Sequence, residues 1–203
     1  MENNSNLNRL AQLSRTTGET TVRVHVNLDG AGTSELNTGI GFFDHMLALF
    51  ARHGGLDLTV AAQGDLQVDG HHTVEDVGIV IGKAISEALG DKKGITRYGH
   101  SYLPMDETLA FCALDISGRP FLVFSADFTS DMVGEFATEL AEEFFRAVSV
   151  HAGITLHMRC EYGTNNHHKI EALFKAFGRA FRQAVSIDLD FADEIPSTKG
   201  ILE

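Results

Sequence analysis

Two short segments decide the fold of this 203-residue chain: HHTVE at residues 71–75 and HHKIE at residues 167–171. Both follow the pattern His-His-x-x-Glu, and each stands at the start of a segment with helical periodicity. Each is preceded by a strand-like segment, and before that by a helical segment that ends near HGGLDL (53–58) or HAGITL (151–156). The order helix, strand, His-His, helix therefore occurs twice, which indicates an internal duplication.

Apolar periodicity predicts the elements on either side of these motifs. Helices are expected where apolar residues recur every three or four positions, at 42–53, 73–89, 135–150 and 168–185. Strands are expected where apolar residues alternate or form short runs, at 20–28, 56–62, 109–116, 121–126 and 154–162. The glycine-rich segment 30–41 is expected to be a loop, and the polar first eight residues are expected to fray.

These elements predict an α+β fold. It consists of two halves, residues 1–95 and 96–203, each a sheet with helices on one face. A pseudo-twofold axis is expected to relate the halves, which together form one compact domain.

Composition excludes several classes of protein. Hydrophobic residues make up 43% of the chain and charged residues 22%, which is typical of a soluble globular domain. The net charge of −12 argues against nonspecific nucleic-acid binding, although it allows a local basic pocket for a small anion. No apolar run approaches the ~18 residues of a membrane span. The N-terminus does not resemble a signal peptide, so we expect a cytoplasmic protein with Cys112 and Cys160 as buried thiols.

The repeated motif carries metal-ligand chemistry. Near a helix start, the spacing puts each histidine on a helical face with the glutamate, three or four residues away. Imidazole and carboxylate together suit Mn, Fe, Co, Ni or Zn, whereas adjacent histidines point in different directions and could serve two metals or two subunits. The alternative is a set of solvated polar residues at helix N-termini, which the repetition disfavours. The protease motif H-E-x-x-H is absent.

Two more histidines could complete two sites of three His and one Glu each. They are His45, which could also be an ordinary helix-terminus histidine, and His157, which could also be an exposed strand residue. His25 and His100 have no partner pattern and are expected at the surface. His151 matches His53 in the repeat, but the sequence assigns it no role.

Six segments in order resemble one known family: GIGFFDHM (39–46), HHTVEDVGI (71–79), PMDE (104–107), SGRP (117–120), HHKIEALFKAF (167–177) and PSTKG (196–200). From about Arg15 to Leu202, the chain resembles the imidazoleglycerol-phosphate dehydratases of histidine biosynthesis, in the monofunctional form without a fused phosphatase domain. The resemblance implies a duplicated unit like the second domain of ribosomal protein S5. It also implies two Mn²⁺ ions per active site, with other divalent metals possible, and trimers that assemble into a 24-subunit cage with active sites between subunits.

The resemblance also implies roles for individual residues. It implies metal ligands at His45, His71, His72, Glu75, His157, His167, His168 and Glu171. It implies substrate contacts at Glu19, His45, His53, Arg97, Arg119, Ser197, Thr198 and Lys199. Glu19, Glu171 and Asp106 are the implied catalytic groups, with Glu19 first and Asp106 second as proton-transfer candidates.

The implied reaction converts imidazole glycerol phosphate into imidazole acetol phosphate and water. The carbon that loses the proton has no adjacent carbonyl group, so simple enolate chemistry is unavailable. The expected route therefore uses a metal-bound imidazolate, which expels the neighbouring hydroxyl and gives a diazafulvene-type intermediate. Taken singly, Glu19 is a solvated residue at a strand start, and each basic residue is a surface charge. The rival functions are a metal-storage cage without catalysis and a metallohydrolase such as a phosphatase. Phosphate release and ketone formation, assayed on the same substrate, separate the three.

Overall fold

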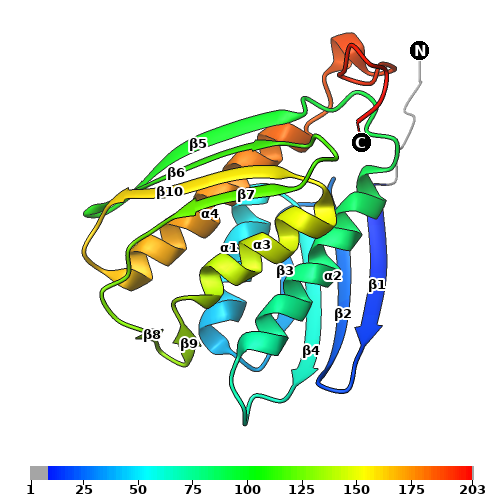
Figure 1. The fold of residues 1–203 in the computed structure, drawn as a ribbon. Coiled ribbons are helices and arrows are strands. Elements are labelled where there is room, and N and C mark those ends of the chain that lie inside the picture. Colours follow the sequence, from blue (N-terminus) through cyan, green and yellow to red (C-terminus); the bar gives the residue numbers. More distant parts are fainter. Residues whose placement is uncertain (1–8, 203) are drawn as a thin grey trace.

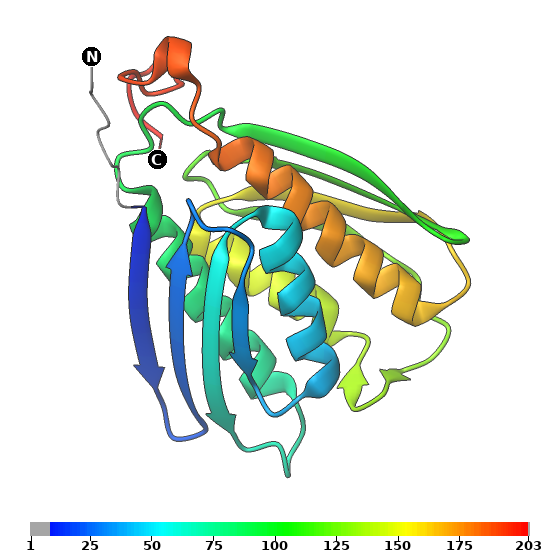
Figure 2. The ribbon, with the colours of Figure 1, turned by 180° about the vertical axis from the view of Figure 1, so that it is seen from behind.

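The computed structural model describes residues 9–202 and contains two four-stranded mixed sheets with four helices between them (Figures 1 and 2). The first sheet has the order β1-β2-β4-β3, with bounds Leu10–Thr16, Thr20–Asn27, Asp57–Gly64 and Ser34–Asn37. The second sheet has the order β5-β6-β10-β7, with bounds Tyr98–Met105, Thr108–Asp115, Thr155–Tyr162 and Phe121–Ser125. The helices are α1 (Gly41–Gly54), α2 (His71–Leu89), α3 (Leu140–Ala152) and α4 (Asn166–Val185). The α+β prediction is confirmed.

The two sheets have the same topology. In each, the third strand of the spatial order pairs antiparallel with the second and parallel with the fourth. Chain order is also the same, three strands, a helix, a strand and a helix, except that the hairpin β8–β9 (Met132–Val133 and Phe136–Ala137) precedes α3. Equivalent topology in the same chain order supports the internal duplication.

The helices exchange partners between the halves. α2 packs on β1 and β2, and α4 packs on β5 and β6, but α1 packs on α4, and α3 on α2. The central layer is aromatic: the rings of Phe50 and Phe177 stack with centroids 5.0 Å apart, and those of Phe145 and Phe174 lie 4.7 Å apart. Full burial of such a side chain stabilises the fold by about 1.5–3 kcal/mol. The aromatic layer therefore fixes how α1 meets α4.

Two glycines permit the close helix crossings. A Cβ atom on Gly178 of α4 would lie 3.1 Å from the Cβ of His53 and 3.0 Å from the nitrogen of Gly54 on α1. A Cβ atom on Gly82 of α2 would lie 2.9 Å from the Cβ of His151 and 3.1 Å from the nitrogen of Ala152 on α3. The two crossings are thus equivalent, and His53 is the structural counterpart of His151.

Several local predictions differ from the structure. The helix predicted at 135–150 starts only at Leu140, as α3. Gly134 adopts φ 60°, which allows Val133 to pair with Phe136 in the hairpin β8–β9. α2 and α4 begin before the predicted positions, so both His-His pairs lie in the first helical turn. Strand β3 lies inside the predicted loop, and strands β1 and β5 were not predicted.

The three strands that the sequence does not predict, β1, β3 and β5, lie at sheet edges. They have many exposed residues, so their sequences lack a clean alternation.

The two cysteines differ in burial. Cys112 is buried as predicted, whereas Cys160 is only half-buried; both are free thiols. The predicted fraying of residues 1–8 lies outside the described residues. After α4, the chain forms a short 3-10 helix, η1 (Leu189–Phe191), and a C-terminal loop.

Candidate active site

Both histidine pairs lie at helix N-termini, where a side chain of a preceding residue accepts hydrogen bonds from the backbone N–H groups of the histidines. In α4, the Asn165 side chain accepts hydrogen bonds from the backbone N–H groups of His167 and His168, at 2.9 and 3.4 Å. In α2, the Asp69 carboxylate accepts from the His71 N–H at 2.8 Å. Such caps satisfy the free N–H groups of the first turn. They hold the histidines at the start of each helix.

Neighbouring histidines diverge as the spacing predicts. The ring centroids of His71 and His72 lie 6.2 Å apart with an interplanar angle of 88°, and those of His167 and His168 lie 6.1 Å apart at 82°. Successive residues of a helix project about 100° apart, so one pair cannot close on a single ion. The two members of each pair therefore face different surroundings.

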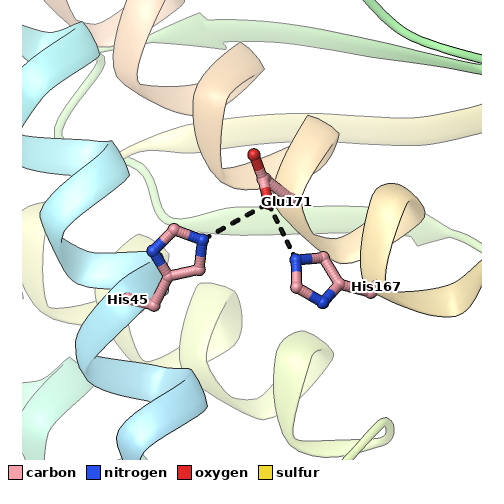
Figure 3. Close-up of side chains that lie close together, drawn as sticks. All are labelled: His45, His167 and Glu171. Atoms are coloured by element: carbon pink, nitrogen blue, oxygen red, sulfur yellow. Dashed lines mark hydrogen bonds and ion pairs between the residues drawn. The ribbon is translucent and has the colours of Figure 1, made fainter.

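One potential metal-binding group forms within the chain (Figure 3). The Nε2 atoms of His45 on α1 and His167 on α4 lie 3.4 and 2.9 Å from Oε2 of Glu171. Among the described residues, this is the one group of three or more potential ligands whose donor atoms lie within 4.8 Å of one another. Two imidazole nitrogens and a carboxylate suit a borderline divalent cation, and three donors leave coordination positions for further ligands.

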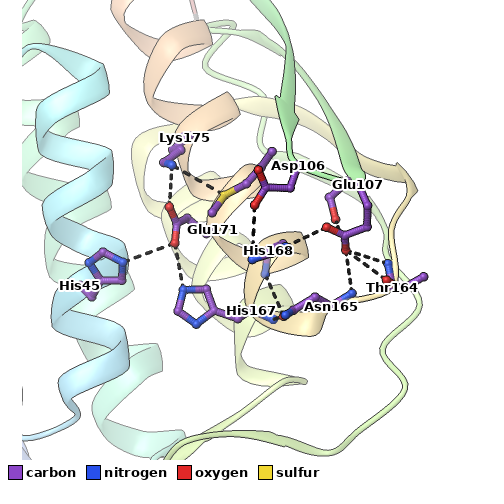
Figure 4. A network of polar contacts seen from close by, with 11 residues as sticks. His45, Asp106, Glu107, Thr164, Asn165, His167, His168, Glu171 and Lys175 are labelled. Atoms are coloured by element: carbon purple, nitrogen blue, oxygen red, sulfur yellow. Dashed lines mark hydrogen bonds and ion pairs between the residues drawn. The ribbon is translucent and has the colours of Figure 1, made fainter.

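Glu171 is held as a carboxylate. Burial opposes its ionisation, but hydrogen bonds from Lys175, His167 and His45 outweigh it and lower the pKa of Glu171. The Lys175 ammonium lies 2.5 Å from Oε1, one helical turn further along α4 (Figure 4). The sequence prediction did not include Lys175, although its spacing from Glu171 puts both on one helical face. An anionic Glu171 can bind a cation without losing a proton first.

The second histidine of each pair, His72 or His168, lies near two carboxylates. Nδ1 of His72 lies 3.0 Å from Asp65, and its Nε2 lies 3.8 Å from Glu19. The hydrogen bond to Asp65 is the main reason why the pKa of His72 is raised.

His168 repeats this arrangement in the second half of the chain (Figure 4). Its Nδ1 lies 2.8 Å from Glu107, and its Nε2 lies 3.8 Å from Asp106. The hydrogen bond to Glu107 raises the pKa of His168. Hydrogen bonds from the Asn165 N–H and from His168 lower the pKa of Glu107. The structure therefore brings Glu19 and Asp106 to the two motifs, and it adds Asp65 and Glu107, which no spacing rule indicates.

The other predicted metal ligands do not converge within the described part of the chain. His71 and Glu75 occupy the positions on α2 that His167 and Glu171 occupy on α4. His157 is exposed on β10, where its neighbours Leu156 and Met158 are buried against the helices. Its side chain therefore lies on the outer face of the sheet, away from the helix layer.

The repeat geometry points to a further residue. Because His151 is the counterpart of His53, the counterpart of His45, two helical turns earlier, is Glu143 on α3. Glu143 Oε2 is 3.5 Å from Nε of Arg146. Because His45 corresponds to a glutamate in the second half, comparison of the two halves by sequence does not reveal this equivalence.

A second site gathers the predicted phosphate-binding residues. A cavity of about 540 Å³ is lined by Arg97, Arg119, Ser197, Thr198 and Lys199, together with Tyr98, Pro196, Ile201 and Leu202. Three cationic side chains and small hydroxyl donors are the groups that bind phosphate in proteins. This pocket is formed by the β5 start, the loop before β7 and the C-terminal loop.

Arg97 organises this cavity. Its Nε and Nη2 donate to the two oxygens of Asp115 at 2.7 and 3.2 Å, and its Nη1 donates to the Pro196 carbonyl at 2.8 Å. The bond to Asp115 raises the pKa of Arg97. Arg97 also has φ 71°, an unfavourable conformation for a non-glycine residue, of the kind concentrated at functional sites. Two of its five N–H donors remain for a ligand.

His53 lies apart from that cavity, in a surface depression of about 500 Å³ that also contains His100, Arg179 and Arg182. Burial, followed by the charges of Lys175 and Arg179, lowers the pKa of His53. His53 stands two turns from His45 on α1, so both face α4.

The ligand group and the phosphate-type cavity lie at opposite ends of α4. His167 is in its first turn, and the Arg97 N–H donates to the carbonyl of Ala184 in its last turn. At 1.5 Å per residue, these positions are separated by roughly 25 Å. A small substrate cannot bridge both within one chain.

Comparison with known proteins agrees with these features. Residues 38–181 match the family model of imidazoleglycerol-phosphate dehydratase. The imidazoleglycerol-phosphate dehydratases of Acetivibrio thermocellus and Halorhodospira halophila are both 58% identical to this chain. The matches cover 97% and 96% of it, and 100% and 98% of those proteins.

Solved structures give the same answer. The enzyme from Staphylococcus aureus superposes with a TM-score of 0.81 at 48% identity, over 88% of this chain and 99% of that one. The enzyme from Pyrococcus furiosus, solved in complex with (S)-C348, superposes with a TM-score of 0.80 at 34% identity, over 94% and 100%. Within residues 9–202, none of the helices has the length and apolar character to cross a membrane. The chain belongs to the imidazoleglycerol-phosphate dehydratase family, the hydro-lyases that remove water from imidazole glycerol phosphate in histidine biosynthesis.

Proposed function

We propose that this chain catalyses the family's dehydration at a composite active site, with metal ligands from one subunit and phosphate-binding residues from another. The length of α4 carries this proposal, because it places Glu171 roughly 20 Å along the helix from Ala184, the residue that Arg97 contacts. The proposed assembly is a 24-subunit cage of trimers in the cytoplasm. Each subunit is proposed to consist of the two halves 1–95 and 96–203.

The proposed metal ligands follow the repeat. One set contains His45, His167 and Glu171, and the other contains His71 and Glu75, with Glu143 or the sequence-predicted His157 as a further ligand. His72 and His168 complete the sets from neighbouring subunits, because their rings diverge from those of His71 and His167. The preferred metal is Mn²⁺, two per active site. When bound, such ions act as Lewis acids on the imidazole ring of the substrate.

The chain's own carboxylates are proposed to move the protons. Hydroxide leaves the carbon attached to the imidazole ring, and a base removes the proton from the next carbon, which gives an enol. Glu19 is the first candidate for this base, since its side chain is 56% exposed and can reach a bound substrate. Asp106 and Glu171 are further candidates. Proton return to the ring-attached carbon then converts the enol into the ketone.

The cavity at the C-terminal loop is proposed to hold the phosphate. Arg119 and Lys199 supply charge, Ser197 and Thr198 supply hydroxyl donors, and Arg97 adds its two unused N–H groups. His53 and His45 are proposed to contact the rest of the substrate. A metal-storage protein has no need for such a cavity, which favours the dehydratase over that rival.

Co-expression of two variants tests the composite site, with the assay run at a substrate concentration at which each variant alone is inactive. Glu171→Gln damages the metal ligands and Lys199→Ala damages the phosphate cavity. With random pairing in a symmetric oligomer, about one quarter of the composite sites are intact in mixed assemblies, so activity returns. If each chain holds a whole active site, the mixture is as inactive as its components. Measuring ketone and free phosphate from the same substrate separates dehydration from hydrolysis.

A further inference from the structure

In both His72 and His168, each of the two ring nitrogens faces a carboxylate. In each, Nδ1 lies within hydrogen-bond distance of a carboxylate: Asp65 at 3.0 Å and Glu107 at 2.8 Å. Nε2 of each faces a second, more exposed carboxylate at 3.8 Å, Glu19 in the first half and Asp106 in the second. Both halves of the chain thus build the same carboxylate–imidazole–carboxylate arrangement.

Duplication alone does not explain the two carboxylates at Nδ1, Asp65 and Glu107. Glu19 and Asp106 occupy equivalent places, the turns β1–β2 and β5–β6. Asp65, however, follows β4, whereas Glu107 lies in the β5–β6 turn beside Asp106. The segment after β10, which corresponds to that of Asp65, begins with Gly163. The same contact to Nδ1 is therefore made from two non-equivalent positions, which indicates a requirement for the contact itself.

The Glu107 carboxylate is fixed in one orientation. Its Oε1 accepts hydrogen bonds from the backbone N–H groups of Thr164 and Asn165, at 3.0 and 2.8 Å, and its Oε2 is left for His168. A carboxylate only accepts hydrogen bonds, so Nδ1 of His168 must carry a proton. In the neutral ring, the lone pair then lies on Nε2, which faces the second carboxylate.

We propose that Asp65 and Glu107 are positioning residues that fix the Nδ1–H tautomer of His72 and His168 and so present Nε2 to a divalent metal. A lone pair that faces a carboxylate across 3.8 Å is repelled unless a cation lies nearby, and metal-ligating histidines commonly use such outer carboxylates. The inference rests on the proposed metal site. It adds two residues that touch neither substrate nor metal.

The variants Glu107→Gln and Asp65→Asn test this role. In Glu107→Gln, the backbone N–H groups at 164 and 165 retain the amide oxygen, so the amide NH₂ faces Nδ1 of His168. Nδ1 must then accept, and the proton moves to Nε2, which blocks metal ligation. The controls are Glu35→Gln, on the exposed face of β3, and Glu161→Gln, which removes a charge paired with Arg159.

The assembled, metal-free proteins are titrated with Mn²⁺ alone, and ¹⁵N solid-state NMR reports the histidine tautomers. We expect Mn²⁺ affinity to fall about 10- to 100-fold in both variants, with a tautomer change in Glu107→Gln, and to stay unchanged in the controls. If the wild type binds no Mn²⁺, the proposed metal site itself fails. If the wild type binds it and the variants bind equally well, or lose affinity without the tautomer change, the positioning role is refuted.

Discussion

Glu19 Oε1 lies 3.8 Å from Nε2 of His72, although the two residues come from the β1–β2 turn and the first turn of α2. Fewer contacts fix Glu19 than fix Glu107: its backbone N–H donates to Thr17 Oγ1 at 3.2 Å, and its carboxylate is largely exposed. A carboxylate that remains free to move, beside a histidine proposed as a metal ligand, is suited to proton transfer.

Glu19→Gln should lower kcat about 10²- to 10⁴-fold, the usual contribution of general acid–base catalysis, with metal content and substrate binding retained. The amide keeps the size of the side chain but cannot act as a base. Single-turnover kinetics, metal analysis and a binding titration measure the three quantities, with Glu35→Gln on the exposed face of β3 as control. Loss of metal together with activity would instead make Glu19 a ligand, and full activity would make it a surface residue.

Glu143→Ala should reduce the manganese content by about one ion per chain, because the repeat makes Glu143 the counterpart of the proposed ligand His45. His157→Ala should leave the metal content unchanged, because its side chain lies on the outer face of the second sheet. Metal analysis after gel filtration decides between them. The reverse result would support the ligand predicted from the sequence, reached across a subunit contact.

Lys199→Ala should weaken substrate binding by about 1.5–3 kcal/mol, as expected for a charge-assisted contact to phosphate, without loss of metal. Arg97→Ala should weaken binding similarly, but it should also lower the melting temperature, because Arg97 ties Asp115 to the C-terminal loop. Isothermal titration with inorganic phosphate and thermal unfolding separate the effects. Wild-type affinity in both variants would show that this cavity does not bind the phosphate group.

The pair of Glu107 and His168 predicts a pH dependence in metal-free protein. The raised pKa of His168 contributes stability that is complete below its ordinary value of 6.5 and is lost as the pH rises through the raised value. The lowered pKa of Glu107 contributes stability above its ordinary value of 4.5 that is lost only as the pH falls further. Glu107→Gln should therefore lower the melting temperature most between about pH 4.5 and 6.5, and less at higher pH.

Thermal unfolding of wild type and Glu107→Gln across this range, in the presence of a chelator, checks the prediction. Glu161→Gln serves as the charge control, because it removes a carboxylate that pairs with Arg159 rather than with His168. A difference between wild type and Glu107→Gln that is constant with pH would mean that the charged pair contributes nothing.

The elements that the sequence predicts well are those with strong apolar periodicity. The four helices and the central strands carry strong apolar periodicity, because one face of each is buried, and they were predicted to within a few residues except at the start of α3. The edge strands β1, β3 and β5 are exposed and irregular, so no alternation marks them. At 135–150, helical periodicity continued through a segment that Gly134 turns into a hairpin.

Two features of the site follow from the repeated motifs without knowledge of the fold: the histidines of each pair diverge, and His167 pairs with Glu171. Helix geometry fixes both, because it sets the relative positions of residues one to four places apart. Three features depend on the tertiary structure: His45 approaches Glu171, Asp65 and Glu107 reach the imidazoles, and α4 separates the ligand group from the phosphate-type cavity. These contacts join residues far apart in the chain. Their proximity depends on how α1 packs against α4 and on the course of individual turns, and neither leaves a periodic signal in the sequence.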